Sequence, residues 1–242
     1  MELARHTLVA DIPAPLRFVV AADVHSAPTD TLWEHIGAEK PDFLVLPGDT
    51  VHSLRTVEDG LAFLQKAAAR YPVFCSLGNH ESVQPPALRE AMRHTGIILL
   101  DNEAMDYRGL CIGGLTSGFY AGARRHGKTP PPDTAFLQAF AARTGEKLLL
   151  CHHPEYYPTY IRPLPIRLTV AGHAHGGQWR WRGQGLFAPG QGLFPKLTDG
   201  LYEDRLLISR GLSNPCGIPR FGNPPQLVTV TLAPNAEYTK SL

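Results

Sequence analysis

The chain has 242 residues, a formal net charge of +1 and 43% hydrophobic residues. This length and composition predict a single globular α/β domain over residues 1–242 and exclude a low-complexity or disordered chain. The near-zero net charge gives no long-range field that would attract nucleic acid, and no nucleic-acid patch is expected. No apolar run reaches the roughly eighteen residues that a membrane-spanning helix needs, and the first residues carry no export-signal pattern.

Four cysteines show neither CxxC spacing nor the density of a disulfide framework: Cys75, Cys111, Cys151 and Cys216. We expect all four to be reduced thiols outside any metal site, and we expect a cytoplasmic location. The densest basic cluster, 124–128, is interpreted as a solvated loop.

Alternating apolar runs and amphipathic segments fill the first half of the chain. Short β-branched runs predict strands at 17–21, 43–46, 73–77, 97–100 and 110–112. Helices are predicted from Thr31, in a capping box with Glu34, to Lys40, and from 85 to 95. Between them, a helix beginning at Thr56 would place Leu61, Leu64 and Ala68 on one face.

The second half is richer in strands. After a Gly-, Arg- and Pro-rich loop and a helix over 133–143, strands are predicted at 147–151, 168–171, 206–209 and 227–232. Trp179–Arg182 alternates like a further strand.

Five polar motifs each follow an apolar run. They are Asp23-Val-His25, Gly48-Asp49, Gly78-Asn79-His80-Glu81, Cys151-His152-His153 and Gly172-His173-Ala174-His175. Each fragment alone is more often a turn, a cap or a surface pair. Their joint occurrence in order favours one site, because α/β sheets gather such residues beyond the carboxyl ends of their strands.

The residue types suit hard or borderline divalent cations such as Mn, Fe or Zn, which accept carboxylate, imidazole and amide-oxygen ligands. Asp49 has two oxygens and could bridge two ions. His173 and His175, separated by Ala174, could point at different ions. The pattern therefore predicts a two-metal hydrolase site, whereas a structural zinc site would favour thiolates.

The motif series D-x-H, G-D, G-N-H-[D/E], H and G-H-x-H resembles the calcineurin-like metallophosphoesterase superfamily over residues 17–232. The segments 172–178, 186–189, 208–212 and 223–227 are similar to its bacterial YkuE/YaeI-like branch. The resemblance implies an α/β fold of two mixed β-sheets packed face to face with flanking helices, a four-layer sandwich.

The resemblance also implies roles for individual residues. One metal would be held by Asp23, His25, Asp49 and His175, and a second by Asp49, Asn79, His152 and His173. His80 would protonate the leaving oxygen, and Glu81 would orient His80. His152 is preferred to His153, which would face away, and His52 is interpreted as a bystander rather than a supporting residue.

The function expected from this resemblance is hydrolysis of a small or lipid-linked phosphoester, with two divalent metals sharing a hydroxide. A phosphodiesterase is favoured. A phosphomonoesterase or a nuclease on the same site is the alternative, and a non-catalytic protein-interaction module is a further one. The oligomeric state is left open.

Several features bear on the substrate without deciding it. Trp179, Trp181, Leu186, Phe187 and Phe194 would form an apolar lip for a lipid or, as the favoured reading, pack against the second sheet. Arg210 and Arg220 would contact a phosphate or be structural, and the loop 116–132 is a candidate lid.

Overall fold

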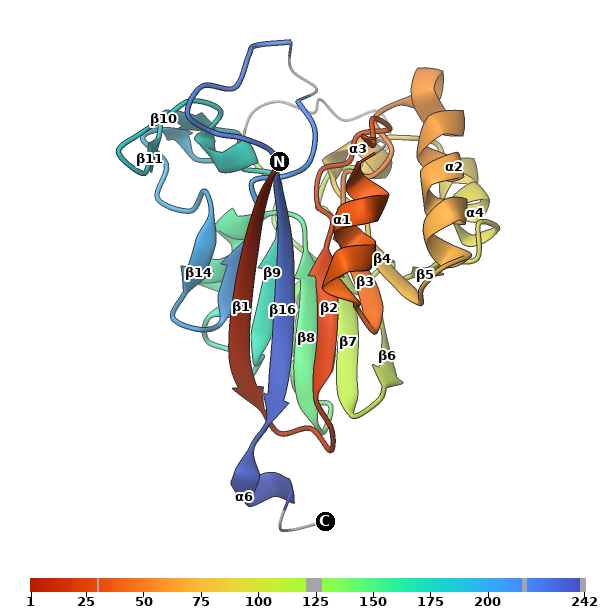
Figure 1. The fold of residues 1–242 in the computed structure, drawn as a ribbon, viewed down its shortest axis with the longest axis vertical. Coiled ribbons are helices and arrows are strands. Elements are labelled where there is room, and N and C mark those ends of the chain that lie inside the picture. The colour runs from red at the N-terminus through yellow and green to blue at the C-terminus, as the bar shows by residue number, and fades with distance from the viewer. Residues whose placement is uncertain (30, 121–127, 215–216, 240–242) are drawn as a thin grey trace.

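The computed structural model describes residues 1–29, 31–120, 128–214 and 217–239. Two mixed sheets of six strands each are packed face to face (Figure 1). The first sheet has the order β1-β16-β2-β3-β4-β5. Its strands are Glu2–Ala10, Gln226–Pro234, Leu16–Val20, Phe43–Pro47, Val73–Ser76 and Ile98–Leu99. All pairs in this sheet are parallel except the antiparallel pair of β16 and β2.

The second sheet has the order β14-β15-β9-β8-β7-β6. Its strands are Gly200–Tyr202, Leu206–Ile208, Leu168–Ala171, Glu146–Cys151, Leu110–Leu115 and Glu103–Tyr107. The four central strands are parallel, and the two edge strands are antiparallel to their neighbours. These mixed sheets confirm the predicted fold class.

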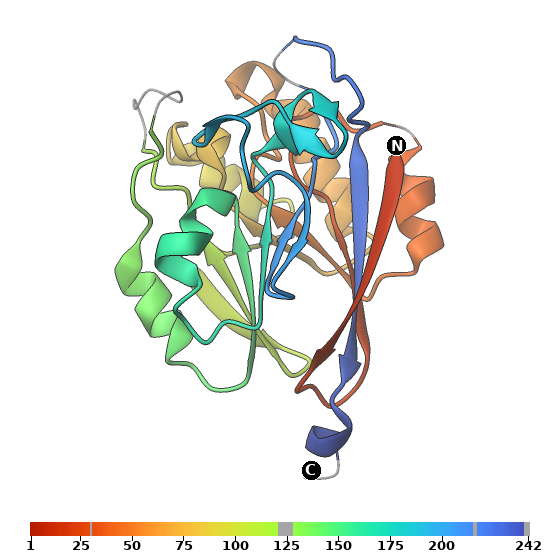
Figure 2. The ribbon, with the colours of Figure 1, turned by 90° about the vertical axis from the view of Figure 1, so that its left-hand side faces the viewer.

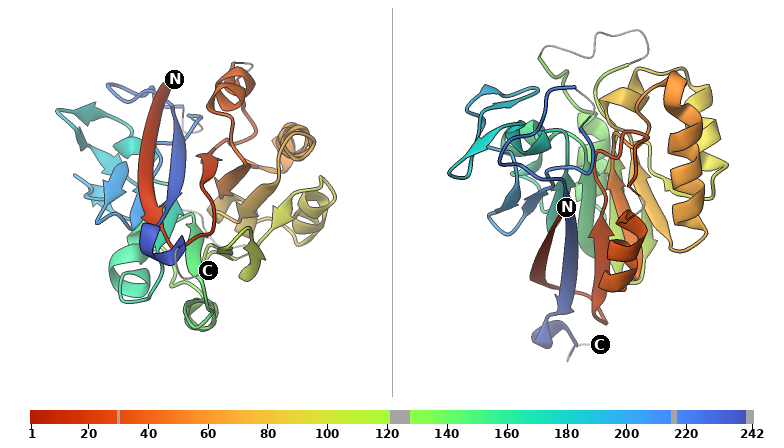
Figure 3. Two further views of the ribbon diagram at one scale, coloured as in Figure 1. Left: turned by 60° about the horizontal axis from the view of Figure 1, so that its bottom comes forward. Right: turned by 45° about the horizontal axis from the view of Figure 1, so that its top comes forward.

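Helices cover the outer face of each sheet (Figure 3). The helices are α1 (Leu32–Glu39), α2 (Val57–Ala68), α3 (Asn79–Ser82), α4 (Ala87–Arg93), α5 (Thr134–Ala141) and α6 (Ala236–Thr239). Short helical turns lie at Leu54–Thr56 (η1), Pro154–Tyr156 (η2), Tyr157–Ile161 (η3) and His175–Gly177 (η4). Among the described residues, no helix combines the length and the apolar character that crossing a membrane requires.

Three buried clusters match the four layers. Between the sheets, Phe18 and Phe43 of the first sheet share a cluster with Leu148 of the second. A second cluster joins the first sheet to α1, α2 and α4, and a third joins the second sheet to α5. Burial of two faces per sheet explains why the central strands are nearly continuous apolar runs.

Most predicted elements are present, but three strands of the two main sheets were missed: β1, β6 and the short edge strand β14. β1 and β6 have polar side chains such as Arg5 and Asp106, and they lie at or near sheet edges, where one face is half solvated. β1 is defined by its nine-residue parallel pairing with β16, a contact between the two ends of the chain that no local pattern encodes.

Two helix details were wrong. The side chain of Thr31 makes no capping hydrogen bond, so the predicted capping box with Glu34 does not form. In α2 the buried residues are Gly60, Phe63, Leu64 and Ala67, whereas the predicted Leu61 and Ala68 are only partly buried. The buried face of α2 is therefore turned by about one position from the predicted one.

Two small hairpins follow β9 and η4 in the chain (Figure 2). β10 (Arg180–Trp181) pairs with β11 (Gln184–Gly185), and β12 (Phe187–Ala188) pairs with β13 (Gly192–Leu193). β10 covers the two middle residues of the strand predicted at Trp179–Arg182, and the second hairpin was not predicted.

Candidate metal centre

The five polar motifs meet at one end of the two sheets. Asp23 and Asp49 follow β2 and β3, Asn79 begins α3 after β4, and His152 and His173 follow β8 and β9. Neighbouring loops are joined by backbone hydrogen bonds, such as that from the His25 N–H to the Asp49 carbonyl (2.9 Å). The structure thus brings together every side chain that the sequence predicted as a ligand.

The first group of donor atoms comprises Asp23, His25 and His175. Nε2 of His25 lies 3.4 Å from Nε2 of His175, and these two atoms lie 3.9 and 3.8 Å from Oδ1 of Asp23. Asp23 is fully buried and accepts hydrogen bonds from the His173 N–H. Three donor atoms therefore converge with room for an ion between them.

The second group centres on the Nε2 atom of His152. That atom lies 3.1 Å from Oδ2 of Asp49, from Oδ1 of Asn79 and from Nδ1 of His173. Nδ1 of His152 donates to the Pro47 carbonyl, so Nε2 is the nitrogen that faces the group. A hydrogen-bonded distal nitrogen is the usual way that proteins orient a histidine ligand.

Asp49 lies between the two groups. Its Oδ2 atom is 3.8 Å from Nε2 of His25 and 3.1 Å from Nε2 of His152. Its Oδ1 atom accepts a hydrogen bond from the His80 N–H (2.9 Å). A carboxylate in this position can contact ions on both sides.

The backbone is unusual at the same residues. Asp23, His25, Asp49, His173 and His175 all have positive φ, between 45° and 64°. Residues other than glycine rarely adopt this conformation, which costs on the order of 1–3 kcal/mol each and concentrates at functional sites. Five of the seven predicted ligands thus have a backbone held by the fold against its local preference.

Glu81 is fully buried and contacts backbone. Its carboxylate accepts hydrogen bonds from the N–H groups of Asp49, Val51 and Gly78 at 2.8–3.0 Å. It therefore fastens the loop of Asp49 to the loop of Asn79. The predicted orientation of His80 is supplied elsewhere, since Nδ1 of His80 donates to the His52 carbonyl (2.7 Å).

His52 lies beside the site, contrary to its interpretation as a bystander. Nδ1 of His52 is also 3.3 Å from Nδ1 of His25. His153 does not face away either. It is fully buried, its ring centroid lies 4.3 Å from that of His173, and its Nε2 atom is 2.7 Å from Oγ of Ser117.

Glu155 is a site residue that the sequence reasoning missed. One of its carboxylate oxygens lies 3.3 Å from Nδ1 of His153 and 3.8 Å from Nε2 of His173. The only signal in the sequence is its position three residues after His152. The buried His153 and the partly buried Glu155 thus lie behind His173, an arrangement of the kind that raises the basicity of a ligand.

Ionisation in the group follows burial and mutual charge. Burial raises the pKa of Asp23 to about 6 and lowers that of His25 to about 3. Burial also opposes charge on Asp49, yet the imidazoles of His152 and His80 hold the Asp49 pKa well below its usual value. For His152, burial is outweighed by Asp49, and the His152 pKa is raised to about 10.

Proton release on metal loading should report this arrangement. At pH 8 the pKa values leave His25 neutral and Asp23 ionised, whereas His152 holds a proton that a metal must displace. We expect at least about one proton to be released per chain, and the apparent metal affinity to rise with pH up to about 10. Titration calorimetry in buffers of different ionisation enthalpy measures the release, and a value of zero would contradict this prediction.

Gly78 offers a steric test of the loop geometry. A Cβ atom at this position would lie 2.1 Å from Oδ1 of Asp49 and 2.6 Å from its backbone nitrogen. We expect Gly78→Ala to displace Asp49, lower metal content and cost about 1–3 kcal/mol of stability. The control is Gly37→Ala in α1, where nothing lies within 4 Å, and which should be neutral or stabilising. Metal analysis and thermal melts compare the two, and unchanged metal content in Gly78→Ala would refute the expectation.

Other predictions have mixed outcomes. Arg210 is buried and ion-paired with Glu2, which supports its structural reading. Arg220 lies closer to the proposed metal ligands, with Nη2 3.1 Å from Nδ1 of His175.

Cys75, Cys111 and Cys151 are free thiols and buried. Cys216, most of the basic cluster 124–128 and the middle of the candidate lid 116–132 lie outside the described residues.

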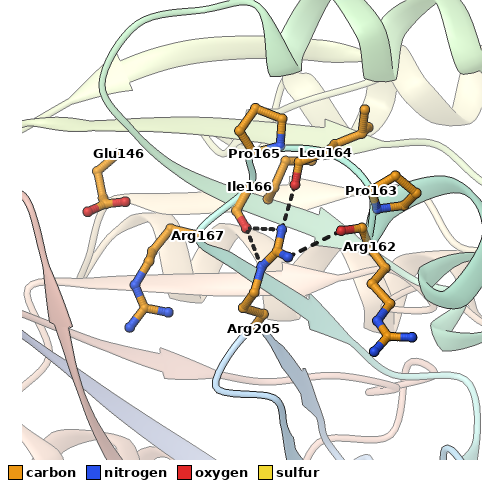
Figure 4. A pocket seen from close by; sticks show the side chains of 8 residues that line it. All are labelled: Glu146, Arg162, Pro163, Leu164, Pro165, Ile166, Arg167 and Arg205. Atoms are coloured by element: carbon orange, nitrogen blue, oxygen red, sulfur yellow. Dashed lines mark hydrogen bonds between the residues drawn. The ribbon is translucent and has the colours of Figure 1, made fainter.

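A second hollow, of about 460 Å³, lies at the opposite end of the second sheet, beside Glu146 at the start of β8 (Figure 4). It is lined by three arginines. The Arg205 guanidinium donates to the carbonyls of Arg162, Leu164 and Ile166. Arg167 likewise donates to the Val9 and Asp204 carbonyls, so both arginines bind backbone around this hollow.

The donor set suits divalent cations. Imidazole nitrogens, carboxylate oxygens and an amide oxygen face one another at 3.1–3.9 Å without enough protons to hydrogen-bond them all. Such a buried cluster at the edge of an α/β sandwich defines a metal-dependent hydrolase.

The family model for calcineurin-like phosphoesterases matches residues 16–177, and the chain belongs to this family. It is a hydrolase that acts on phosphoester bonds. The family uses divalent metals, and the donor groups described above could hold them.

Two proteins are similar to this chain in sequence. The chain is 30% identical over 200 residues to phosphodiesterase YaeI of Escherichia coli (strain K12), covering 74% of this chain and 68% of that protein. It is 26% identical over 230 residues to an uncharacterized metallophosphoesterase of Aquifex aeolicus (strain VF5), covering 90% and 85%. A solved structure of phosphopantetheinyl hydrolase from Mycobacterium tuberculosis aligns with a TM-score of 0.39 and 15% identity, covering 67% and 84%.

Proposed function

We propose that the chain is a phosphodiesterase that holds two divalent cations, Mn, Fe or Zn, and hydrolyses a small or lipid-linked phosphoester. The observation that carries the proposal is the position of Asp49, whose Oδ2 atom lies 3.8 Å from His25 in one donor group and 3.1 Å from His152 in the other. Similarity to a phosphodiesterase supports the diester preference.

The proposed division of ligands follows the two groups. Asp23, His25 and His175 would hold one ion, Asn79, His152 and His173 the other, and Asp49 both. Two divalent cations held there would activate a water and neutralise charge on a phosphoryl group.

The remaining steps are carried by side chains of the chain itself. Because Nδ1 of His80 is committed to the His52 carbonyl, Nε2 is the atom that can carry a proton into the site. This nitrogen lies 3.9 Å from Oδ2 of Asp49, on the side of the donor groups. We assign it the protonation of the leaving oxygen, which is general acid catalysis. Glu81 would keep Asp49 and His80 in register through its three backbone contacts.

Substrate preference can be tested with two chromogenic esters. Purified protein supplemented with Mn²⁺ should hydrolyse bis-p-nitrophenyl phosphate with a higher kcat/KM than p-nitrophenyl phosphate. The reverse order would favour the phosphomonoesterase alternative. No hydrolysis and no bound metal would favour a non-catalytic interaction module. The nuclease alternative gains little support from a net charge of +1.

A further inference from the structure

Large apolar side chains are exposed in one region beside the site. Of the twelve that the described part of the chain exposes, eight lie within 179–194 and 218–221. We call them the apolar lip: Trp179, Trp181, Leu186, Phe187, Leu193, Phe194, Ile218 and Phe221. Trp181 is 70% exposed and Phe194 is 66% exposed, so the favoured interpretation that they pack against the second sheet is wrong for these two side chains. Contiguous exposed apolar surface of this kind marks an interaction site.

Hydrogen bonds hold the segments of the apolar lip together. The Leu186 N–H donates to the Trp179 carbonyl, and the Phe194 N–H donates to the Leu186 carbonyl, both at 2.8 Å. The indole of Trp179 donates to the Pro219 carbonyl, and its backbone forms a bridge with Phe221. An apolar hollow of about 260 Å³ opens between Trp179, Leu186, Phe187 and Ile218. Both hairpins and the 218–221 segment therefore present their side chains as one unit.

The lip adjoins the metal centre. It begins a few residues after His175, whose carbonyl accepts a hydrogen bond from the Asn223 amide (2.7 Å). Arg220, between Ile218 and Phe221, reaches Nδ1 of His175. Strands β10 and β11 lie at the same end of the molecule as α3, which carries Asn79 and His80 (Figure 1).

The exposed charges within the lip segments are basic. Residues 179–198 and 217–225 contain four basic residues and no aspartate or glutamate: Arg180, Arg182, Lys196 and Arg220. Arg180 is ion-paired with the neighbouring Asp199 (2.8 Å), so it adds little to the charge of this rim. Arg182 and Lys196 are exposed. Tryptophan and phenylalanine beside basic side chains are the combination that binds the interface of an anionic bilayer.

We propose that the apolar lip docks on an anionic lipid bilayer surface and holds the metal centre against it. A bilayer is favoured over a second copy of the chain because the lip combines exposed aromatic tips with a basic rim, and like-charged rims would repel each other. Docking would bring a phosphoester in the bilayer close to the metal centre. This consequence rests on the proposed function, whereas the docking itself does not.

Vesicle co-sedimentation of the full chain tests the docking. The vesicles would be phosphatidylcholine with and without about 30% phosphatidylglycerol. Wild type would be compared with the triple variant Trp181→Ser/Phe187→Ser/Phe194→Ser. Because binding scales with buried apolar area, the partition coefficient on anionic vesicles should fall about tenfold or more in this variant. The matched control is Val9→Ser, an equally exposed apolar position on β1, which should bind like wild type. Thermal melts and metal content establish that the variants are folded.

Each outcome decides a separate point. Binding that needs phosphatidylglycerol, is lost in the triple variant and is accompanied by a blue shift of tryptophan emission supports the proposal. Wild type that does not sediment with anionic vesicles, or a triple variant that binds equally well, overturns it. So does a wild-type dimer in solution that the triple variant converts to monomer, because the lip would then bind a second copy. Hydrolysis of bis-p-nitrophenyl phosphate by wild type without vesicles tests the proposed function on its own.

Discussion

Asp49→Asn should abolish activity and release metal. The substitution keeps the size of the side chain but removes the charge and leaves one oxygen to serve two roles. In Asp49, Oδ2 faces both donor groups and Oδ1 accepts a hydrogen bond from the His80 N–H. A metal ion contributes several kcal/mol of transition-state stabilisation, so we expect kcat/KM to fall by at least about 10³-fold. Mass-spectrometric metal analysis on dialysed protein, beside kinetics on bis-p-nitrophenyl phosphate, measures both effects.

The control for this experiment is Asp59→Asn, an exposed aspartate on α2. It removes the same charge from an aspartate that belongs to neither donor group, and it should retain metal and activity. If Asp49→Asn kept its full metal content, Asp49 would not bridge the two groups, and the proposed centre would have to be divided differently.

His80→Ala should behave in the opposite way toward metal. We expect kcat to fall by about 10²–10⁴-fold, the usual contribution of a general acid, while metal content stays at the wild-type level. The reason is geometric: the backbone N–H of His80, which donates to Asp49, is retained, and only the imidazole is lost.

The leaving group separates an acid from a structural residue. The loss in His80→Ala should be larger for a phenyl ester than for a p-nitrophenyl ester, since p-nitrophenolate needs its proton less. His94→Ala, an exposed histidine at the end of α4, should show no loss with either ester. An equal loss with both esters, or a loss of metal, would contradict the assigned role.

These two variants divide the site by function. Asp49 is buried, has positive φ and is held by the N–H of His80, so its position is fixed by tertiary contacts. His80 is partly exposed and has its distal nitrogen committed to a carbonyl. A rigid carboxylate beside a more accessible imidazole suits the proposed roles, in which Asp49 would hold ions and His80 would move a proton.

The sequence by itself determined the fold class and the set of candidate ligands. Apolar runs encode the central strands because those strands are buried on two faces, and a polar residue directly after such a run stands at the carboxyl edge. Asp23, Asp49, Asn79, His152 and His173 could be picked out in this way before any contact was known.

Only the tertiary structure decided how the chain closes on itself and what supports the ligands. The pairing of β1 with β16 joins residues more than two hundred positions apart, which no local period records. Glu155 lies behind His173, and Glu81 contacts backbone, because loops from different strands meet at that edge. The apolar lip likewise follows from exposure. The sequence around a Trp or Phe does not show whether a neighbouring sheet will cover its side chain. In the described part of this chain, the aromatic side chains of the lip are exposed.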